Sequence, residues 1–343
     1  MLYPEPLKKG SRIAITAFST GIAQRHEKRF NEIMRTLRNR GYEVVVGDCL
    51  KGEYKHVSAP KEQRASELMK FLTDDSIDAV APPWGGELAI EILPLLNFDL
   101  ISKSKPKWLF GFSDVSTIAA SINSIIGWVT VHSSNLMDLI DTNTDPLTSN
   151  TLNYLEVNLG GVVEQVASDR NTRNWPKIES DPLASIVCDE NTEWKWLNKP
   201  NNSEFISGRI IGGCWDIFIY LFGTPYLSLS GMNSKYKEGV ILYLENAEMM
   251  PCDLVRAIHS MEFHGVFEAI NGLVIGRNFA VDSNNDSDLT YFEVLTDNLG
   301  SKNIPVIYDV DIGHVPPNLT IFNGSYAEIG IFNGKGVLTQ WLK

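Results

Sequence analysis

Short apolar runs rich in β-branched residues alternate with longer runs of mixed polarity along the first half of the chain. The short runs are typical of strands, and the longer runs place apolar residues at the spacing of one helix face. In chain order the runs are RIAITAF (12–18), RHEKRFNEIMRTLRNRG (25–41), YEVVVGD (42–48), PKEQRASELMKFLTDD (60–75), IDAVAPPW (77–84), ELAIEILPLL (87–96) and KWLFGFS (107–113). Gly41 is expected to end one helix, and Ser58-Ala59-Pro60 to begin the next. This alternation predicts βαβ units and a parallel sheet that continues through GWVTVHSS (127–134).

The second half begins with an irregular segment and then returns to alternating runs. From residue 171 to 204 the chain is rich in Asn, Asp, Pro and Trp, so we interpret residues 171–205 as a loop segment between two domains. Asn-Gly pairs at 323 and 333 separate alternating runs and predict antiparallel hairpins. The sequence therefore predicts an α/β fold, with an N-terminal parallel-sheet domain (1–170) and a smaller C-terminal mixed β/α domain (206–343).

Composition narrows the possible partners. The chain has 42 acidic and 30 basic residues, a net charge of −12, which would repel nucleic acid and anionic membrane surfaces. Its four cysteines lie far apart with no CxxC pair, which favours reduced thiols over a zinc site or a disulfide framework. The N-terminus lacks the order of a signal peptide, and no apolar run reaches the length of a membrane span. We therefore expect a soluble cytoplasmic protein without a metal or cofactor.

Ser113 ends a predicted strand and directly precedes a predicted helix, which is where ligands bind in open parallel sheets. On local evidence Ser113 has two possible roles, and the turn alone favours the first, an N-cap of the helix. The second role is a nucleophile, with the oxyanion held by the backbone N–H of Asp114 and that of Gly85 or Gly86. The stretch GFSDVS does not match the GxSxG motif of α/β-hydrolases.

A serine nucleophile needs a base, and two histidines follow predicted strands. His314 lies between a glycine and two prolines in IGHVPPN, a rigid loop that fixes the direction of a side chain, and it is the preferred base. His132 is interpreted as a supporting or structural residue. Glu245 ends the buried run GVILYLE and is costly there unless paired, so it is the candidate to orient the base, with Glu248 as the other candidate.

The acidic stretch DSNNDSDLTYFE (282–293) has the spacing of a calcium loop. Ser287 stands where such a loop needs glycine, so we interpret the stretch as a loop that caps a helix beginning near Thr290. Three tryptophans of the interdomain segment, Trp175, Trp194 and Trp196, either stack on a ligand or pack against the second domain.

Four motifs together resemble the LD-carboxypeptidase family of serine peptidases, which also contains the microcin C self-immunity proteins. They are WGGEL (84–88), GFSDVS (111–116), LYLENAE (242–248) and IGHVPPNLT (312–320), in that order. The stretch GRIIGGCWDIFIYLFGTPY (208–226) is similar to the start of the family's second domain, so the resemblance covers nearly the whole chain.

The resemblance implies a cleft between an N-terminal flavodoxin-like domain and a C-terminal mixed domain. It implies that Ser113 is the nucleophile, His314 the general base and then acid, and Glu245 the residue that orients the imidazole. The capping role then falls to Asp114 or Ser116. A homodimer is also implied by the family.

The substrate stays open between two classes. Trp84 stands where carboxypeptidase members carry arginine before the paired glycines, and the tryptophan-bearing segment is more similar to the immunity branch. We therefore expect a small-molecule or short-peptide substrate, in contact with Trp84, Trp175, Trp194 and Trp196. An aminoacyl or peptidyl nucleotide antibiotic is preferred, and a murein tetrapeptide cleaved in peptidoglycan recycling is the alternative. A non-catalytic nucleotide- or peptide-binding module is the hypothesis from another class.

Overall fold

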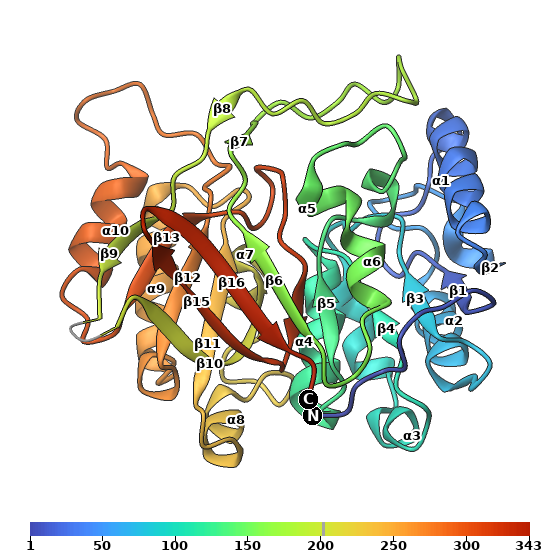
Figure 1. The fold of residues 1–343 in the computed structure, drawn as a ribbon, viewed down its shortest axis with the longest axis horizontal. Helices are drawn as coiled ribbons and strands as arrows, with labels where there is room; N and C mark the ends of the chain where they lie inside the picture. The colour runs from blue at the N-terminus through green and yellow to red at the C-terminus, as the bar shows by residue number, and fades with distance from the viewer. Residues whose placement is uncertain (201–202) are drawn as a thin grey trace.

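Two β-sheets organise the structure, a computed structural model that describes residues 1–200 and 203–343 (Figure 1). The smaller sheet is parallel throughout, with strand order β2-β1-β3-β4. Its strands are β1 (Arg12–Ile15), β2 (Glu43–Val46), β3 (Ala79–Ala81) and β4 (Trp108–Leu109). The helices of this half are α1 (Glu27–Asn39), α2 (Lys61–Thr73), α3 (Phe98–Ser102), α4 (Val115–Ile126), α5 (Pro146–Ser149) and α6 (Thr151–Leu155). The predicted parallel α/β organisation of the first half is confirmed.

The larger sheet is mixed and has eight strands in the order β6-β16-β15-β10-β11-β12-β13-β9. Neighbouring strands from β10 to β13 are parallel, and the remaining pairs are antiparallel. The strands are β6 (Val162–Val166), β9 (Lys195–Asn198), β10 (Phe205–Cys214), β11 (Val240–Glu245), β12 (Gly272–Gly276), β13 (Val306–Val310), β15 (Tyr326–Phe332) and β16 (Lys335–Trp341). Its helices are α7 (Trp215–Phe218), α8 (Leu229–Lys235), α9 (Pro251–Phe263) and α10 (Tyr291–Leu299).

Strand β5 (Thr130–His132) corrects two predictions. It meets the smaller sheet only through a single bridge between Phe110 and Val131, so the parallel sheet does not continue through residues 127–134 as a full ladder. Instead β5 pairs antiparallel with β14 (Ile321–Asn323) from the other half of the chain. The strand after the first Asn-Gly pair, β15, pairs with β10 and β16 and not with β14, so this pair makes no hairpin. The second pair does join β15 to β16 as predicted.

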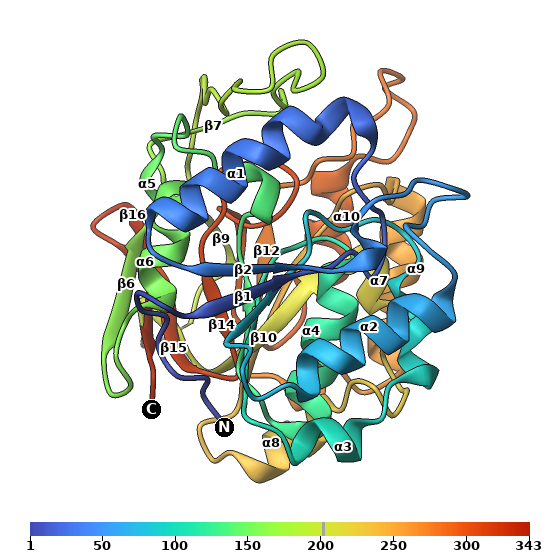
Figure 2. The ribbon, with the colours of Figure 1, turned by 90° about the vertical axis from the view of Figure 1, so that its right-hand side faces the viewer.

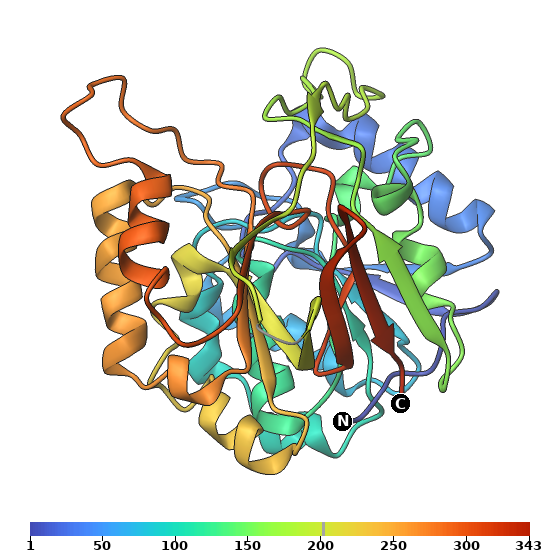
Figure 3. The same cartoon turned by 60° about the vertical axis from the view of Figure 1, so that its left-hand side comes forward.

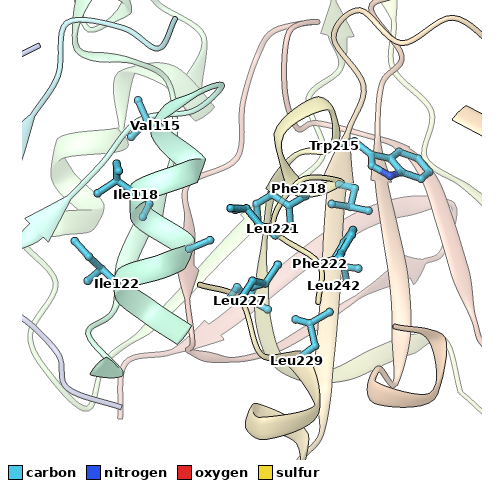
Figure 4. Close-up of a cluster of buried hydrophobic side chains, with 14 of the residues drawn as sticks. Val115, Ile118, Ile122, Trp215, Phe218, Leu221, Phe222, Leu227, Leu229 and Leu242 are labelled. Atoms are coloured by element: carbon cyan, nitrogen blue, oxygen red, sulfur yellow. The ribbon is translucent and has the colours of Figure 1, made fainter. Parts of the chain in front are cut away.

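The apolar core passes from one sheet to the other through α4. One buried cluster contains Val115, Ile118 and Ile122 of α4 together with residues around α7 and β11, including Phe218 and Leu242 (Figure 4). Removing a buried Ile or Leu side chain to Ala costs about 2–5 kcal/mol, so this shared packing fixes one sheet firmly against the other. The helix that follows Ser113 is therefore a rigid element between the two halves.

A long loop, residues 172–189, links the two halves on one side of the molecule. It connects β7 (Arg170–Asn171) to β8 (Glu190–Asn191), two strands that pair with each other, and it extends over α1 (Figures 1 and 2). The buried Arg29 of α1 donates to the carbonyl oxygens of Pro182 and Ala184 at 3.2 and 2.7 Å. We call residues 172–189 the bridging loop.

The acidic stretch before α10 stands out from the body of the molecule (Figure 3). Thr290 and Glu293 form a reciprocal capping box at the start of α10, and Asp282 accepts a hydrogen bond from the Tyr291 N–H at 2.8 Å. The prediction that this stretch caps a helix beginning near Thr290 is confirmed.

Among the described residues, no helix combines the length and apolar composition needed to cross a bilayer.

Candidate active site

Ser113 lies on a tight turn between β4 and α4. Its φ is +64°, a left-handed conformation that costs a residue with a Cβ roughly 1 kcal/mol or more. Gly111 precedes it with φ +140°, and a Cβ there would lie 2.7 Å from Asn135 Oδ1. That Asn135 oxygen instead accepts the Phe112 N–H at 3.0 Å. The turn is thus held in a strained shape by its surroundings, as is common where a side chain must be presented for chemistry.

The paired glycines at 85 and 86 lie close to Ser113. A Cβ on Gly85 would be 2.8 Å from both the Asp114 nitrogen and Ser113 Cβ, so a side chain there would fill the space beside the serine. Gly86 has φ +144°, and a Cβ there would meet the hydroxyls of Ser19 and Thr20. This turn therefore needs glycine for close approach at 85 and for conformation at 86.

His314 and Glu245 reach the same place from the larger sheet. His314 Nε2 is 3.1 Å from Ser113 Oγ, and His314 Nδ1 is 2.9 Å from Glu245 Oε2. Glu245 is the last residue of β11, and His314 follows Gly313, whose φ is +101°. The structure thus brings together the three residues that the motifs singled out, 201 and 69 positions apart in sequence.

Glu245 is fully buried in a cradle of glycines. A Cβ on Gly313 would be 2.3 Å from Glu245 Oε2, and one on Gly276 would be 2.8 Å from Glu245 Cβ. One carboxylate oxygen, Oε1, has no hydrogen-bond partner among the described residues. Glu248, the other candidate, is exposed, so Glu245 is the acid that faces the imidazole.

The pKa of His314 reflects opposing effects. Burial is the largest and disfavours the charged imidazolium, but the charge and hydrogen bond of Glu245, and to a smaller extent the charges of Asp216 and Glu248, raise the pKa above its usual 6.5. His132 differs, because burial and the proximity of His314 lower its pKa to about 3. Neither ring nitrogen of His132 has a partner in the described part of the chain, and its ring packs edge-on against Tyr243. His132 therefore stays neutral, in agreement with a structural role.

Asp114 and Ser116 do not cap α4, which corrects the prediction. Asp114 occupies the N-cap position with helical backbone angles, and its carboxylate makes no capping bond. It accepts instead from Ser19 Oγ at 2.6 Å, from the Ala89 N–H at 2.8 Å and from Thr117 Oγ1 at 2.9 Å. Ser116 Oγ accepts from the Cys214 N–H at 3.3 Å. Both side chains join α4 to neighbouring segments, because the strained turn already sets the start of the helix.

The four tryptophans lie in different environments. Trp175, in the bridging loop, donates from Nε1 to the carbonyl oxygen of His314 at 2.9 Å and stacks on Phe112 with an interplanar angle of 9°. Trp84 is half-buried and donates to the Gly21 carbonyl. Trp194 is a core residue, only 5% exposed and bonded to Asp311, so the packing alternative holds for it and the expected contact with a substrate is wrong. Trp196 is half-buried against the core of the larger sheet.

The sequence interpretation missed the residues that support the site from behind. Asp216 accepts the N–H groups of Ala247, Glu248 and Met249 at 2.9, 2.9 and 3.1 Å, which fixes the turn after Glu245. Arg277 is buried, pairs with Asp311 at 2.6 Å and donates to carbonyl oxygens of the loop after His314. The sequence held a signal for Arg277, because this charged residue comes directly after the buried strand β12. The polar residue Asn246 comes directly after β11 in the same way.

Cys214 is a further neighbour that the sequence interpretation did not connect with the site. It ends β10 opposite Glu245 in the parallel register. Its thiol has a pKa well above the usual value, because it is buried and lies near the carboxylates of Glu245 and Asp216. Cys214, Glu245 and His314 are also the one group of possible metal ligands that the described residues bring together.

Comparison with known proteins gives matches along most of the chain. Residues 13–133 match the model of the LD-carboxypeptidase N-terminal domain, and residues 207–329 match that of the LD-carboxypeptidase C-terminal domain. The microcin C7 self-immunity protein of Escherichia coli is 23% identical over 99% of this chain and 96% of its own length. A Bacillus subtilis protein named probable murein peptide carboxypeptidase is also 23% identical, over 94% of this chain and 90% of its own length.

Solved structures show the same fold. The structure of the microcin C7 self-immunity protein in complex with aspartyl sulfamoyl adenosine superimposes with a TM-score of 0.84 at 20% identity, covering 100% of this chain and 99% of that one. The two-sheet arrangement is therefore shared by both chains over their full lengths.

Proposed function

Since this chain belongs to the LD-carboxypeptidase family, we propose that it is a serine hydrolase that cleaves an amide bond through an acyl-enzyme, with Ser113, His314 and Glu245 as its catalytic triad. The observation that carries the proposal is the continuous contact from Ser113 Oγ to His314 Nε2 at 3.1 Å and from His314 Nδ1 to Glu245 Oε2 at 2.9 Å. A nucleophile, a base and a group that orients the base are thus within hydrogen-bond reach of one another.

In the first half-reaction, Ser113 Oγ attacks the carbonyl carbon of the scissile amide. His314 Nε2 takes the hydroxyl proton, and the Glu245 carboxylate stabilises the imidazolium that forms. The negative charge that develops on the carbonyl oxygen is directed to the N–H of Asp114 and to that of Gly85 or Gly86. The amide C–N bond then breaks, and His314 gives the proton to the leaving amine.

In the second half-reaction, water attacks the Ser113 ester. His314 accepts a proton from the water, the tetrahedral intermediate uses the same N–H donors, and the C–O bond to Ser113 breaks. The acid product leaves, and His314 returns the proton to Ser113 Oγ. Each proton taken by the imidazole is given back within the cycle, so the enzyme ends in its starting state.

For the substrate we favour an aminoacyl or peptidyl nucleotide of the microcin type. The half-buried Trp175 ring beside His314 offers a flat apolar surface suited to a nucleobase, and one relative is named as a microcin self-immunity protein. A polar pocket of about 460 Å³ lies next to the site, lined by Arg173 in the bridging loop and by Val315, the residue after His314. With Trp194 in the core, the case for base stacking rests on Trp175.

The alternative substrate is a murein tetrapeptide, which the name of the Bacillus subtilis relative supports at the same identity. Turnover of an aminoacyl sulfamoyl adenosine and of a murein tetrapeptide by the purified protein separates the two. We expect the higher kcat/KM for the nucleotide, and Ser113→Ala should lose both activities. Brisk cleavage of the tetrapeptide alone would overturn the substrate assignment, and binding of either compound without cleavage would favour a non-catalytic binding module.

A matched pair of tryptophan variants tests the role of Trp175. In Trp175→Phe the smaller ring and the lost bond to His314 should raise KM for the nucleotide severalfold, an effect of roughly 1 kcal/mol. Trp194→Phe, which changes the buried core ring, should lower stability and leave KM unchanged. Equal KM values for the wild type and Trp175→Phe would remove Trp175 from the substrate site.

A further inference from the structure

Behind the Ser113–His314 contact lies a cluster of three different metal-binding groups. The thiol of Cys214, the carboxylate of Glu245 and the imidazole of His314 each offer one atom, and these atoms lie within 4.8 Å of one another. The cluster is built into the sheet, because Cys214 and Glu245 are register partners at the ends of the parallel strands β10 and β11.

Two of these groups, the Glu245 carboxylate and the Cys214 thiol, have an atom with few hydrogen-bond partners that could bind a cation. Glu245 is fully buried, and its Oε1 has no hydrogen-bond partner among residues 1–200 and 203–343, although Oε2 faces His314. An unpaired buried carboxylate oxygen is costly, and a cation would satisfy it. The Cys214 sulfur, itself buried, makes one side-chain hydrogen bond in that part of the chain, which it donates to Asp216 Oδ2 at 3.5 Å.

The mixture of ligand types points to a particular class of cation. Thiolate, imidazole and carboxylate together suit Zn²⁺ and similar thiophilic divalent ions, whereas Mg²⁺ and Ca²⁺ prefer oxygen ligands alone. Zinc bonds of about 2.0–2.3 Å place tetrahedral ligands roughly 3.5 Å apart. His314 Nδ1 and Glu245 Oε2, now 2.9 Å apart, would therefore separate slightly to admit the ion, and the Cys214 sulfur lies within 4.8 Å of the other two ligand atoms. Of the three residues only His314 is partly exposed, and a cation would enter beside its ring.

We propose that Cys214, Glu245 and His314 form an inhibitory binding site for Zn²⁺ or a similar thiophilic divalent cation. Cys214 loses its proton to solvent and binds through sulfur, and Glu245 binds through its carboxylate. His314 binds through Nδ1, the nitrogen that faces Glu245, while its ring proton moves to Nε2. With a proton on Nε2 and Glu245 engaged by the metal, His314 cannot accept the proton of Ser113. That this blocks catalysis rests on the proposed function; the binding itself does not.

Two measurements test the site. In the first, the metal-free protein is titrated with Co²⁺, and the near-ultraviolet band of thiolate-to-cobalt charge transfer is followed. In the second, turnover is measured over a range of Zn²⁺ concentrations, with Mg²⁺ as the control cation. The variants are Cys214→Ala and Cys214→Ser, with Cys252→Ser as the matched control, because Cys252 is an exposed cysteine on α9.

We expect the cobalt band in the wild type and in Cys252→Ser and its loss in both Cys214 variants. Zinc should inhibit the wild type and Cys252→Ser, whereas the Cys214 variants, each compared with its own metal-free rate, should need at least about tenfold more zinc. Absence of the band in the wild type, or its persistence in Cys214→Ser, would overturn the site whether or not the protein proves to be a hydrolase. A band without zinc inhibition of an active enzyme would overturn the inhibitory role.

Discussion

Asp114 and Glu245 are buried carboxylates on opposite sides of the contact between Ser113 and His314, and their surroundings differ. On the smaller-sheet side, Asp114 accepts three hydrogen bonds from uncharged donors, which belong to Ser19, Ala89 and Thr117. On the larger-sheet side, Glu245 bonds only to His314 through one oxygen and leaves the other unpaired in the described structure.

The difference assigns distinct tasks to the two sides. The smaller-sheet side uses its carboxylate to fix three segments around the strained turn, so that the position of Ser113 is determined before a substrate arrives. On the larger-sheet side, the Glu245 carboxylate has no other hydrogen-bond donor besides His314 in the described structure, so its charge acts directly on the imidazole. There it stabilises the positive charge that forms on His314 during the reaction. One side supplies geometry and the other supplies charge, and each of the following predictions tests that division.

Ser113→Ala should have the largest effect, a loss of at least about 10⁴-fold in kcat, because no other hydroxyl lies within reach of His314 Nε2 in the described hydrogen bonds. Ser113→Gly should be equally inactive. Its free energy of unfolding should match or exceed that of the wild type, because glycine adopts φ +64° without strain. Denaturant unfolding beside the kinetic assay checks both, and a clearly destabilised Ser113→Gly would contradict the strain argument.

Glu245→Gln should lower kcat/KM between about 100- and 10,000-fold, because the imidazolium loses its compensating charge. The variant also moves the pH profile. Neutral His314 is the active base, so activity falls as the pH drops through its pKa, which Glu245 raises above 6.5. Without that charge, burial lowers the pKa of His314, so the fall of kcat/KM on the acidic side of the pH profile moves to lower pH. An unshifted fall in Glu245→Gln would show that Glu245 does not act on His314.

Gly85→Ala and Gly86→Ala separate chemistry from conformation in the paired glycines. A methyl group at 85 fills the space beside Ser113 and the Asp114 N–H, so kcat should fall about 100-fold. A methyl group at 86 meets Ser19 and Thr20 on a backbone with φ +144°, so this variant should chiefly lower the free energy of unfolding, by about 1–3 kcal/mol. If Gly85→Ala chiefly lost stability and Gly86→Ala chiefly lost activity, the assignment of the oxyanion site to Gly85 would be wrong.

How much of this was predictable depends on whether a feature is local in sequence. The parallel α/β half and the helix at Thr290 follow from runs and caps within a few residues, and both predictions are confirmed. The pairing of β5 with β14 was not predictable, and the burial of Trp194 was predictable only as one of two alternatives, because each depends on a partner more than 100 residues away.

In the candidate site, too, the residues with a local sequence signal were predicted, and the contacts made by distant residues were not. Ser113, Glu245 and His314 each end or follow an apolar run, and the motifs named them. The contacts of the Asp114 and Cys214 side chains are set by residues far away in sequence, so a single sequence could suggest only a helix cap for the first and a reduced thiol for the second.

Asp114→Asn should have the smallest effect on activity, within about threefold, because an amide oxygen can still accept from Ser19 and Ala89, and the Thr117 hydroxyl can turn to accept. Its effect on stability depends on pH. Burial raises the pKa of Asp114 above its usual 3.8 although three hydrogen bonds oppose the shift. A carboxyl whose folded pKa is raised contributes stability at low pH and loses it as the pH rises from about 3.8 through the folded pKa. The wild type should therefore lose stability relative to Asp114→Asn over that interval, measured by urea unfolding at several pH values. If instead the free energy of unfolding of the wild type rose relative to that of Asp114→Asn with rising pH, the charged form of Asp114 would stabilise the fold. The contrast between the two sides would then be wrong.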